Sequence, residues 1–186
     1  MKSGKETLLL LLAAGLLASC GGGTFQKPET QNESIIIGYL DMDDAPGSFN
    51  GVSMKKLQPA EKKPYYYFAT EGGIFYRGHV PPGVYKMDSF TSFSRLKNTS
   101  YTFNFPQSGR SEMDLRITKP GVYFVGSWKF KKVDVSAKEW LFGRGKFDLV
   151  RIEKPTELEL LKKIQPEANE PYWADMIRRR IAELGK

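Results

Sequence analysis

Short runs of β-branched and aromatic residues, separated by glycine and proline, recur along most of this chain. The runs cover residues 35–40, 65–68, 74–76, 84–87, 101–105, 115–117, 122–125 and 147–150. Several of them alternate apolar with polar residues, as a strand with one solvent-facing side does. The segments between them contain the Gly and Pro combinations that favour turns. Short strands at this spacing predict a mainly β fold, an antiparallel β-sandwich of about seven or eight strands, over residues 34–153.

Residues 154–186 show helical spacing instead. Thr156 with Glu159 forms a capping-box pattern, which starts a helix, and Pro171 is placed to begin a second one. Apolar residues including Trp173 then recur on one face. We expect two short α-helices that form a C-terminal hairpin on the sandwich, with Trp173 buried between helix and sheet.

The composition excludes several classes of site. The chain has 186 residues and a formal net charge of +7, with 28 Lys and Arg against 21 Asp and Glu, one Cys and one His. One cysteine excludes an internal disulfide and a Cys-based zinc site, and one histidine excludes a multi-histidine metal site. We therefore predict no metal ion and no cofactor.

The first twenty residues have the order of an export signal. Lys2 and Lys5 precede an apolar run over residues 8–18. The run is shorter than the roughly 20 apolar residues of a permanent membrane span, but it matches the h-region of a signal peptide. It leads into Leu17-Ala18-Ser19-Cys20, which holds the single cysteine, and then into three glycines.

This order resembles the lipobox of bacterial lipoproteins. In that family the thiol receives a diacylglyceryl group, the signal peptide is cut before the cysteine, and the new amino terminus can be acylated as well, for example with palmitate. The resemblance implies a signal peptide over 1–19, cleavage between Ser19 and Cys20, and lipidation of Cys20. Two or three acyl chains would hold the protein on a membrane, because stable anchoring takes two membrane signals. The alternative is an ordinary secretory signal with an incidental cysteine.

The residues after the cysteine indicate how far the domain can stand from the membrane and which membrane holds it. Residues 20–33 are polar and Gly-rich, which predicts a flexible tether. Many lipoproteins of enterobacteria with Asp after the cysteine stay in the inner membrane, and this chain has Gly21 there. The resemblance therefore implies the outer membrane in a Gram-negative cell, and the outer face of the plasma membrane in a Gram-positive one.

A second resemblance covers residues 71–87, which read EGGIFYRGHVPPGVYKM. The stretch is similar to a pattern of transthyretin-like and carboxypeptidase-regulatory-like β-sandwiches, D/E-G-x-F followed by L-P-P-G-x-Y-x-L, with Val80 in place of the first Leu. We expect Phe75, Tyr85 and Met87 to point into the core. Domains of these families usually serve as structural, binding or stabilising modules. Residues 38–46 also resemble an element of uncharacterised bacterial envelope lipoproteins.

Three carboxylates, Asp41, Asp43 and Asp44, raise the question of a calcium site. An EF-hand loop that began at Asp41 would need Gly at its sixth position and Glu at its twelfth, but the chain has Pro46 and Val52 there. That excludes an EF-hand. We expect an acidic turn at the end of a strand, and a looser cation site stays open.

His79 is the only candidate for imidazole catalysis. The G-x-S-x-G motif of a nucleophile elbow is absent, although convergent triads need no fixed motif. We expect a surface or rim histidine beside the Pro-Pro-Gly turn. An envelope hydrolase is the least favoured hypothesis, and it would need a cleft with convergent polar groups.

Basic residues cluster at 55–56, 62–63, 129–132 and 178–180, and aromatic residues surround the third cluster. Such a pattern in a cytosolic chain would favour nucleic acid, but an exported chain meets no chromosome. We predict instead a surface for anionic envelope lipid or glycan, formed by Lys129, Lys131, Lys132, Trp128 and Trp140. A solvated cationic face without a ligand is the alternative.

These observations predict a non-enzymatic protein of the bacterial cell envelope, attached to a membrane through N-terminal acyl chains and displaying a β-sandwich. Its expected partners are the membrane, other envelope proteins and anionic glycan or lipid, but not nucleic acid. Binding of an anionic envelope polymer or lipid is the alternative function.

Overall fold

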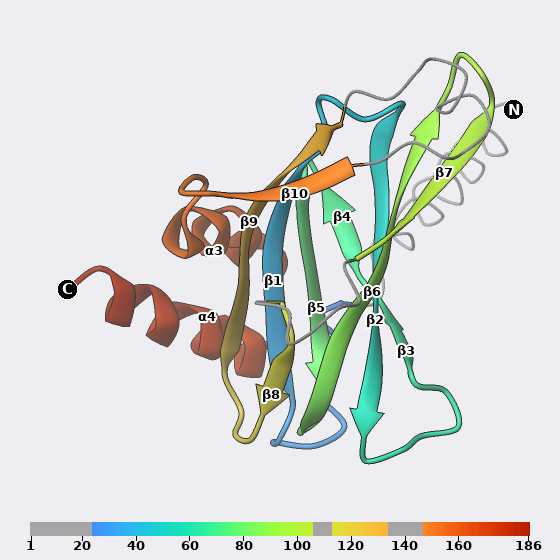
Figure 1. Ribbon diagram of the computed structural model, residues 1–186. Helices are drawn as coiled ribbons and strands as arrows, with labels where there is room; N and C mark the ends of the chain where they lie inside the picture. The colour runs from blue at the N-terminus through green and yellow to red at the C-terminus, as the bar shows by residue number, and fades with distance from the viewer. Residues whose placement is uncertain (1–23, 106–112, 134–146) are drawn as a thin grey trace, which may run out of the picture.

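The computed structural model describes residues 24–105, 113–133 and 147–186 as two β-sheets packed face to face, with two helices on one outer face (Figure 1). The predicted mainly β sandwich with two C-terminal helices is confirmed. The strands are β1 Ser34–Asp41, β2 Ser48–Gln58, β3 Tyr65–Tyr67, β4 Ala69–Glu71, β5 Ile74–Val80, β6 Gly83–Ser94, β7 Thr99–Asn104, β8 Leu115–Ile117, β9 Val122–Lys132 and β10 Phe147–Ile152. The helices are α3 Glu157–Ile164, a 3₁₀ turn η1 Gln165–Glu167, and α4 Pro171–Leu184.

The two sheets each hold five strands. We call them sheet A, in the order β10-β9-β1-β5-β4, and sheet B, in the order β3-β2-β6-β7 with β8 also paired to β6. The pairings are antiparallel except for β1 with β9, which is parallel. The sandwich is thus antiparallel, as expected, apart from this one pair of strands. A parallel pair needs a long crossover connection, and β1 and β9 are separated by most of the sandwich.

The core between the sheets is rich in aromatic side chains. Phe90 stacks on Phe103 with ring centroids 5.1 Å apart, and Phe130 stacks on Phe147 at 5.3 Å. As expected, the following side chains all point into this core and are at most 2% exposed: Phe75, Tyr85 and Met87. Aromatic pairs in such offset and edge-to-face contacts stabilise a core beyond their buried area.

The outer face of sheet A forms a second core with the helices. Ile35 and Ile37 of β1 face the helices, whereas Ile36 between them faces the other sheet. Leu161 of α3 and Trp173 of α4 are fully buried against this face. Sheet A is therefore a central layer with apolar contacts on both sides.

The segment 71–87 contains two reversals of different kinds. Gly72 and Gly73 both have positive φ (53° and 86°) and join β4 to β5 within sheet A. The connection at 81–82 instead carries the chain from sheet A to sheet B, since β5 and β6 belong to different sheets. The Tyr85 hydroxyl donates to the carbonyl oxygen of Pro81 at 2.6 Å, which ties this crossing to the core.

The capping box of α3 is formed as predicted. The Thr156 hydroxyl accepts from the Glu159 amide at 3.3 Å, and the Glu159 carboxylate accepts from the Thr156 amide at 2.7 Å. Neither helix, nor any other within the described ranges, has the length and apolar character needed to cross a bilayer.

Candidate functional site

The first ten described residues, 24–33, are packed on the domain, and we call them the N-terminal clasp. Phe25 stacks on Tyr76 of β5 with ring centroids 5.6 Å apart and planes 13° apart, and it also contacts Trp173 of α4 at 6.2 Å. The indole Nε1 of Trp173 donates to the carbonyl oxygen of Gln26 at 2.6 Å. The expected flexible tether over 20–33 is therefore wrong for this stretch, because an aromatic side chain and buried donors hold it. Cys20 lies outside the described residues, as do Ser19 and the signal segment.

A glycine in β5 makes room for the clasp. A Cβ at residue 78 would lie 2.4 Å from the carbonyl oxygen of Thr24, closer than such atoms can approach. Gly78 also stands in a bulge, where the pairing of β1 with β5 shifts register between Ser34 and Ile36. Glycine without a side chain thus allows the backbone of the clasp to cross directly over the strand.

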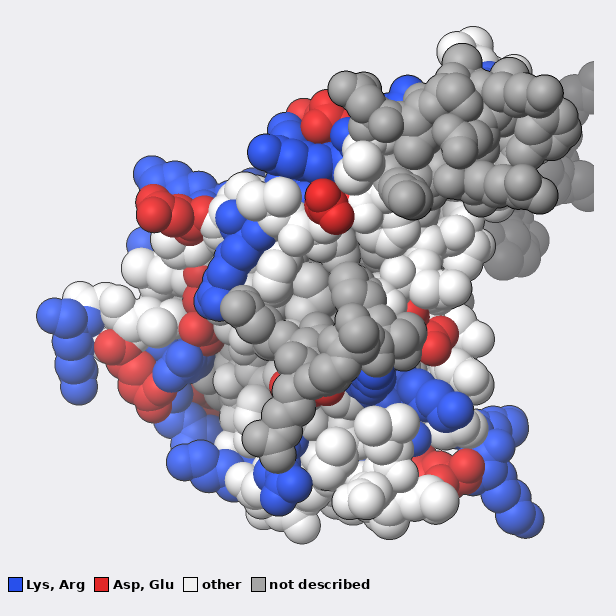
Figure 2. Space-filling model, viewed as in Figure 1, with Lys and Arg blue, Asp and Glu red and all other residues white. Residues whose placement is uncertain are grey.

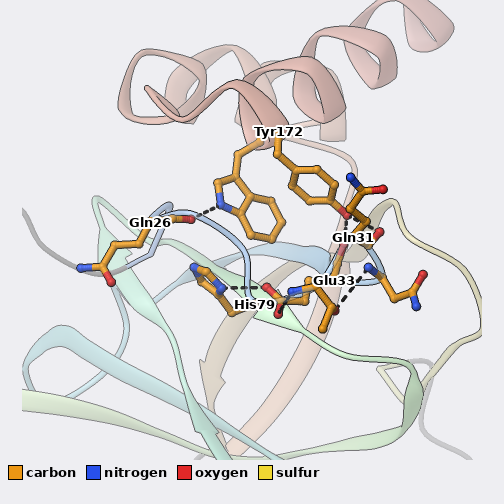
Figure 3. A network of polar contacts seen from close by, with 8 residues as sticks. Gln26, Gln31, Glu33, His79 and Tyr172 are labelled. Carbon is orange, nitrogen blue, oxygen red and sulfur yellow. Dashed lines mark hydrogen bonds and ion pairs between the residues drawn. The ribbon is translucent and has the colours of Figure 1, made fainter.

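A buried carboxylate closes the other end of the clasp (Figure 3). Glu33 is 5% exposed, and its Oε2 lies 2.7 Å from Nδ1 of His79. The Oε1 atom of Glu33 accepts from the backbone amide of Thr30 at 3.2 Å. The imidazole in turn contacts the Trp173 ring edge-on, with centroids 5.0 Å apart. The histidine expected at the rim is thus the link between the clasp, β5 and α4.

The backbone of His79 is itself unusual. Its φ is 55°, in the left-handed region that few non-glycine residues occupy, although histidine is enriched among those that do. Such conformations persist where the surroundings hold them. Here the contacts of its side chain with Glu33 and with Trp173 supply that restraint.

Tyr172, at the start of α4, reaches the clasp backbone. Its hydroxyl contacts the carbonyl oxygens of Gln31 at 2.9 Å and Glu33 at 2.8 Å. Burial, together with the charge of Glu33, raises the pKa of Tyr172 above its ordinary value. The hydroxyl therefore stays protonated and serves as a donor.

This arrangement joins the clasp to β5 and α4. His79 has a carboxylate partner, but in the described part of the chain no hydrogen bond joins its imidazole to a serine, threonine or cysteine. Glu33 and Trp173 are buried, whereas the His79 side chain is 22% exposed. A groove of about 580 Å³ runs beside α4, lined by Lys119, Arg179 and Arg180 among others. Its Arg180 is held by Glu157 at 2.7 Å.

The predicted basic and aromatic surface around β9 is not formed as expected. Trp128 is 9% exposed, lies in the core between the sheets, and donates from Nε1 to the Val125 carbonyl at 2.8 Å. Lys129 pairs with Asp41 at 3.1 Å. Alternation along a strand explains this, because Trp128 and the adjacent Lys129 point to opposite faces. Lys131 and Lys132 are exposed, whereas Trp140 lies outside the described residues.

The acidic turn after β1 is organised by local contacts. Asp41 accepts from the Asp43 amide at 3.0 Å and pairs with Lys129, while Asp43 and Asp44 are exposed. Within residues 24–105, 113–133 and 147–186, no three His, Cys, Asp or Glu side chains are grouped to hold a metal ion.

Sequence analysis missed most of the clasp. Phe25 is the single large apolar side chain in the polar stretch 21–33, and that was the available signal. No local sequence signal indicated the role of Glu33, because its partner His79 is 46 residues away.

The comparisons with known proteins add little. No family model matches the sequence, and no curated protein does. A solved structure, a variant of BcpA, the major pilin subunit of Bacillus cereus, is 13% identical over 49% of this chain and 28% of that chain, with a TM-score of 0.29. The chain thus spans little more than a quarter of that pilin. Backbones that agree so little give no basis for transferring fold or function.

Proposed function

We propose that this chain is a lipid-anchored, non-enzymatic protein of the bacterial cell envelope, whose β-sandwich is displayed beside the membrane as a structural or binding module. The observation that carries the proposal is the position of the only cysteine. Cys20 directly follows a basic and apolar export signal in the segment Leu17-Ala18-Ser19-Cys20. Acylation there would give the chain two or three membrane signals, enough for stable anchoring.

The clasp supports this function. A protein that is attached to a membrane through its amino end needs that end fixed to the folded domain. The clasp does this, because it joins residues 24–33 to both β5 and α4. Acylation of Cys20 would consume the single thiol of the sequence. With Gly21 after the cysteine, we propose the outer membrane as the site in a Gram-negative cell, or the outer face of the plasma membrane in a Gram-positive cell.

Replacing the thiol tests the proposal. The full chain and Cys20→Ser are expressed in a bacterium, and the amino-terminal peptide and membrane fraction are analysed by mass spectrometry. We expect the unchanged chain to begin at residue 20 with acyl chains attached. Cys20→Ser is expected to lose them and to leave the membrane or remain an uncut precursor.

A matched control moves the thiol. Cys20→Ser combined with Lys97→Cys keeps one cysteine, now at an exposed hairpin tip, and it is expected to gain no lipid. An unmodified residue 20 in a chain that still begins with Met1 would refute the anchor.

A further inference from the structure

The outer face of sheet B carries an exposed group of tyrosines and lysines, which we call the β2–β3 patch. Its large side chains are Leu57, Tyr65 and Tyr67, which are 44%, 46% and 68% exposed. They are three of the five exposed large hydrophobic side chains among the described residues. The patch also holds Lys55 of β2 and, in the β2–β3 connection, Lys62 and Lys63.

Strand alternation places these side chains together. Lys55 pairs with Tyr65 across the strands, and its ammonium lies 5.6 Å from the centroid of that ring. Lys86 of β6 is the neighbour of Lys55 on the other side. Lys and Arg side chains accordingly gather over the β2–β3 connection, at the lower right of Figure 2.

The one carboxylate of the β2–β3 connection has a basic partner. Glu61 pairs with Lys56, an almost fully buried lysine, and accepts from the Tyr66 hydroxyl at 2.9 Å. The hydrogen bond from Lys56 lowers the pKa of Glu61 below its ordinary value. Glu61 therefore stays ionised with Lys56 as its partner, and Lys55, Lys62 and Lys63 supply the positive charge of the patch.

The strand that lies beneath the clasp is linked to the strand at the edge of the patch. Arg77 of β5 donates to the Tyr67 carbonyl at 2.6 Å, and its guanidinium lies 5.4 Å from the centroid of the Tyr66 ring. The next residue, Gly78, lies beneath Thr24, the first described residue of the clasp. Arg77 thus connects sheet A, beside the start of the clasp, to the β3 backbone in sheet B.

The clasp also sets the length of the connection to the lipid. Four residues from Cys20 to Thr24 span at most roughly 14 Å, whereas a free tether as far as Glu33 would span roughly 45 Å. This short connection, which we call the leash, raises the effective concentration of the domain at the membrane surface. Tyrosine suits the boundary between apolar and aqueous phases, and lysines near an anionic surface are attracted to it.

From this geometry we infer that the β2–β3 patch lies against the anionic headgroups of the bilayer that anchors the chain. The inference rests on the lipid anchor proposed above and adds the face that meets the membrane. Charge complementarity and the short leash both point to a lipid surface as the occupant.

Lysine reactivity in vesicles tests the inference with the complete lipidated protein. The protein is reconstituted into vesicles of phosphatidylcholine alone or with phosphatidylglycerol, and acetylation of each lysine is followed by mass spectrometry. We expect Lys55, Lys62 and Lys63 to react several-fold more slowly in the anionic vesicles, and high salt to remove the difference. Exposed lysines elsewhere, Lys97, Lys162 and Lys163, are the internal controls and are expected to react equally in both.

Several outcomes would overturn the inference: no protection of the patch, equal protection of all six lysines, equal protection in neutral vesicles, or protection only by an added soluble anionic polysaccharide. A failed anchor is recognised separately, because the protein would then not float with vesicles at all. A second measurement follows the iodination of Tyr67 in the anionic vesicles, which the membrane should slow in a salt-sensitive way. The triple variant Lys55→Gln, Lys62→Gln, Lys63→Gln should abolish this protection of Tyr67. The equal charge change Lys97→Gln, Lys162→Gln, Lys163→Gln should leave that protection in place.

Gly78→Ala tests the leash, since the added Cβ would displace Thr24 and lengthen the free segment. We expect protection of the patch lysines to fall while the protein stays on the vesicles. Unchanged protection in this variant would refute the role of the clasp.

Discussion

The two outer faces of the sandwich differ in what covers them. The outer face of sheet A is buried beneath α3, α4 and the clasp, and its Ile35 and Ile37 have no exposed surface. The outer face of sheet B is open, and its Tyr65 and Tyr67 are about half exposed or more (46% and 68%). One sandwich thus has a structural side, where the C-terminal helices secure the amino end, and a side free to meet a partner.

The difference is visible in the strand sequences. Strand β1 reads Ile35-Ile36-Ile37 without alternation, as a strand buried on both faces does. Strand β2 alternates apolar with polar residues over Val52-Ser53-Met54-Lys55, and the pattern breaks at Lys56, which is buried. A continuous apolar run therefore indicates the central layer of this molecule, and an alternating one its open layer.

The largest expected effect comes from removing the central side chain of the covered face. Trp173 is fully buried and contacts Phe25, His79 and Tyr172. Trp173→Ala should lower the free energy of unfolding by about 3–5 kcal/mol. Tyr67→Ala on the open face should change it by less than about 0.5 kcal/mol. Urea denaturation of both variants measures the contrast, and equal effects would show that the two faces do not differ in this way.

A smaller effect is expected at the edge of the covered face. Thr156→Ala removes the hydroxyl that accepts from the Glu159 amide, and it should cost about 1 kcal/mol of stability. Thr156→Ser keeps an oxygen acceptor and should retain most of the stability. Thermal unfolding compares the two, and equal melting temperatures would mean that the cap does not stabilise the attachment of α3.

The smallest effect concerns the open face and depends on pH. The pKa of Glu61 is lowered in the folded chain, first by its hydrogen bond from Lys56. The stability it supplies is therefore present above the ordinary pKa of 4.5 and is lost as the pH falls through the lower folded value. Glu61→Gln should be less stable at neutral pH by less than about 1 kcal/mol, because Glu61 is about one third exposed.

Denaturation at neutral and acid pH checks this dependence. The difference between Glu61→Gln and the unchanged chain should shrink as the pH falls below 4.5. Glu29→Gln, a change at an exposed position of the clasp, is the control and should show little difference at either pH. A difference for Glu61→Gln that stays constant with pH would contradict the proposed ion pair.

Sequence patterns predicted eight of the ten strands described, and missed β2 and β4. Strand β2 was missed because one of its inward positions holds Lys56, which is 4% exposed and is compensated by Glu61. No local pattern reveals such a partner. The surface role of Trp128 was also wrong, although alternation along β9 separates that ring from Lys129 and could have indicated it.

Turns, helix caps and strand runs could be recognised from the amino-acid order, because each depends on residues a few positions apart. Which outer face is covered, and where the amino end is held, follow from contacts such as that of Trp173 with Gln26, 147 residues away. Those contacts depend on how the sheets stack, so they appear with the assembled fold and not before it.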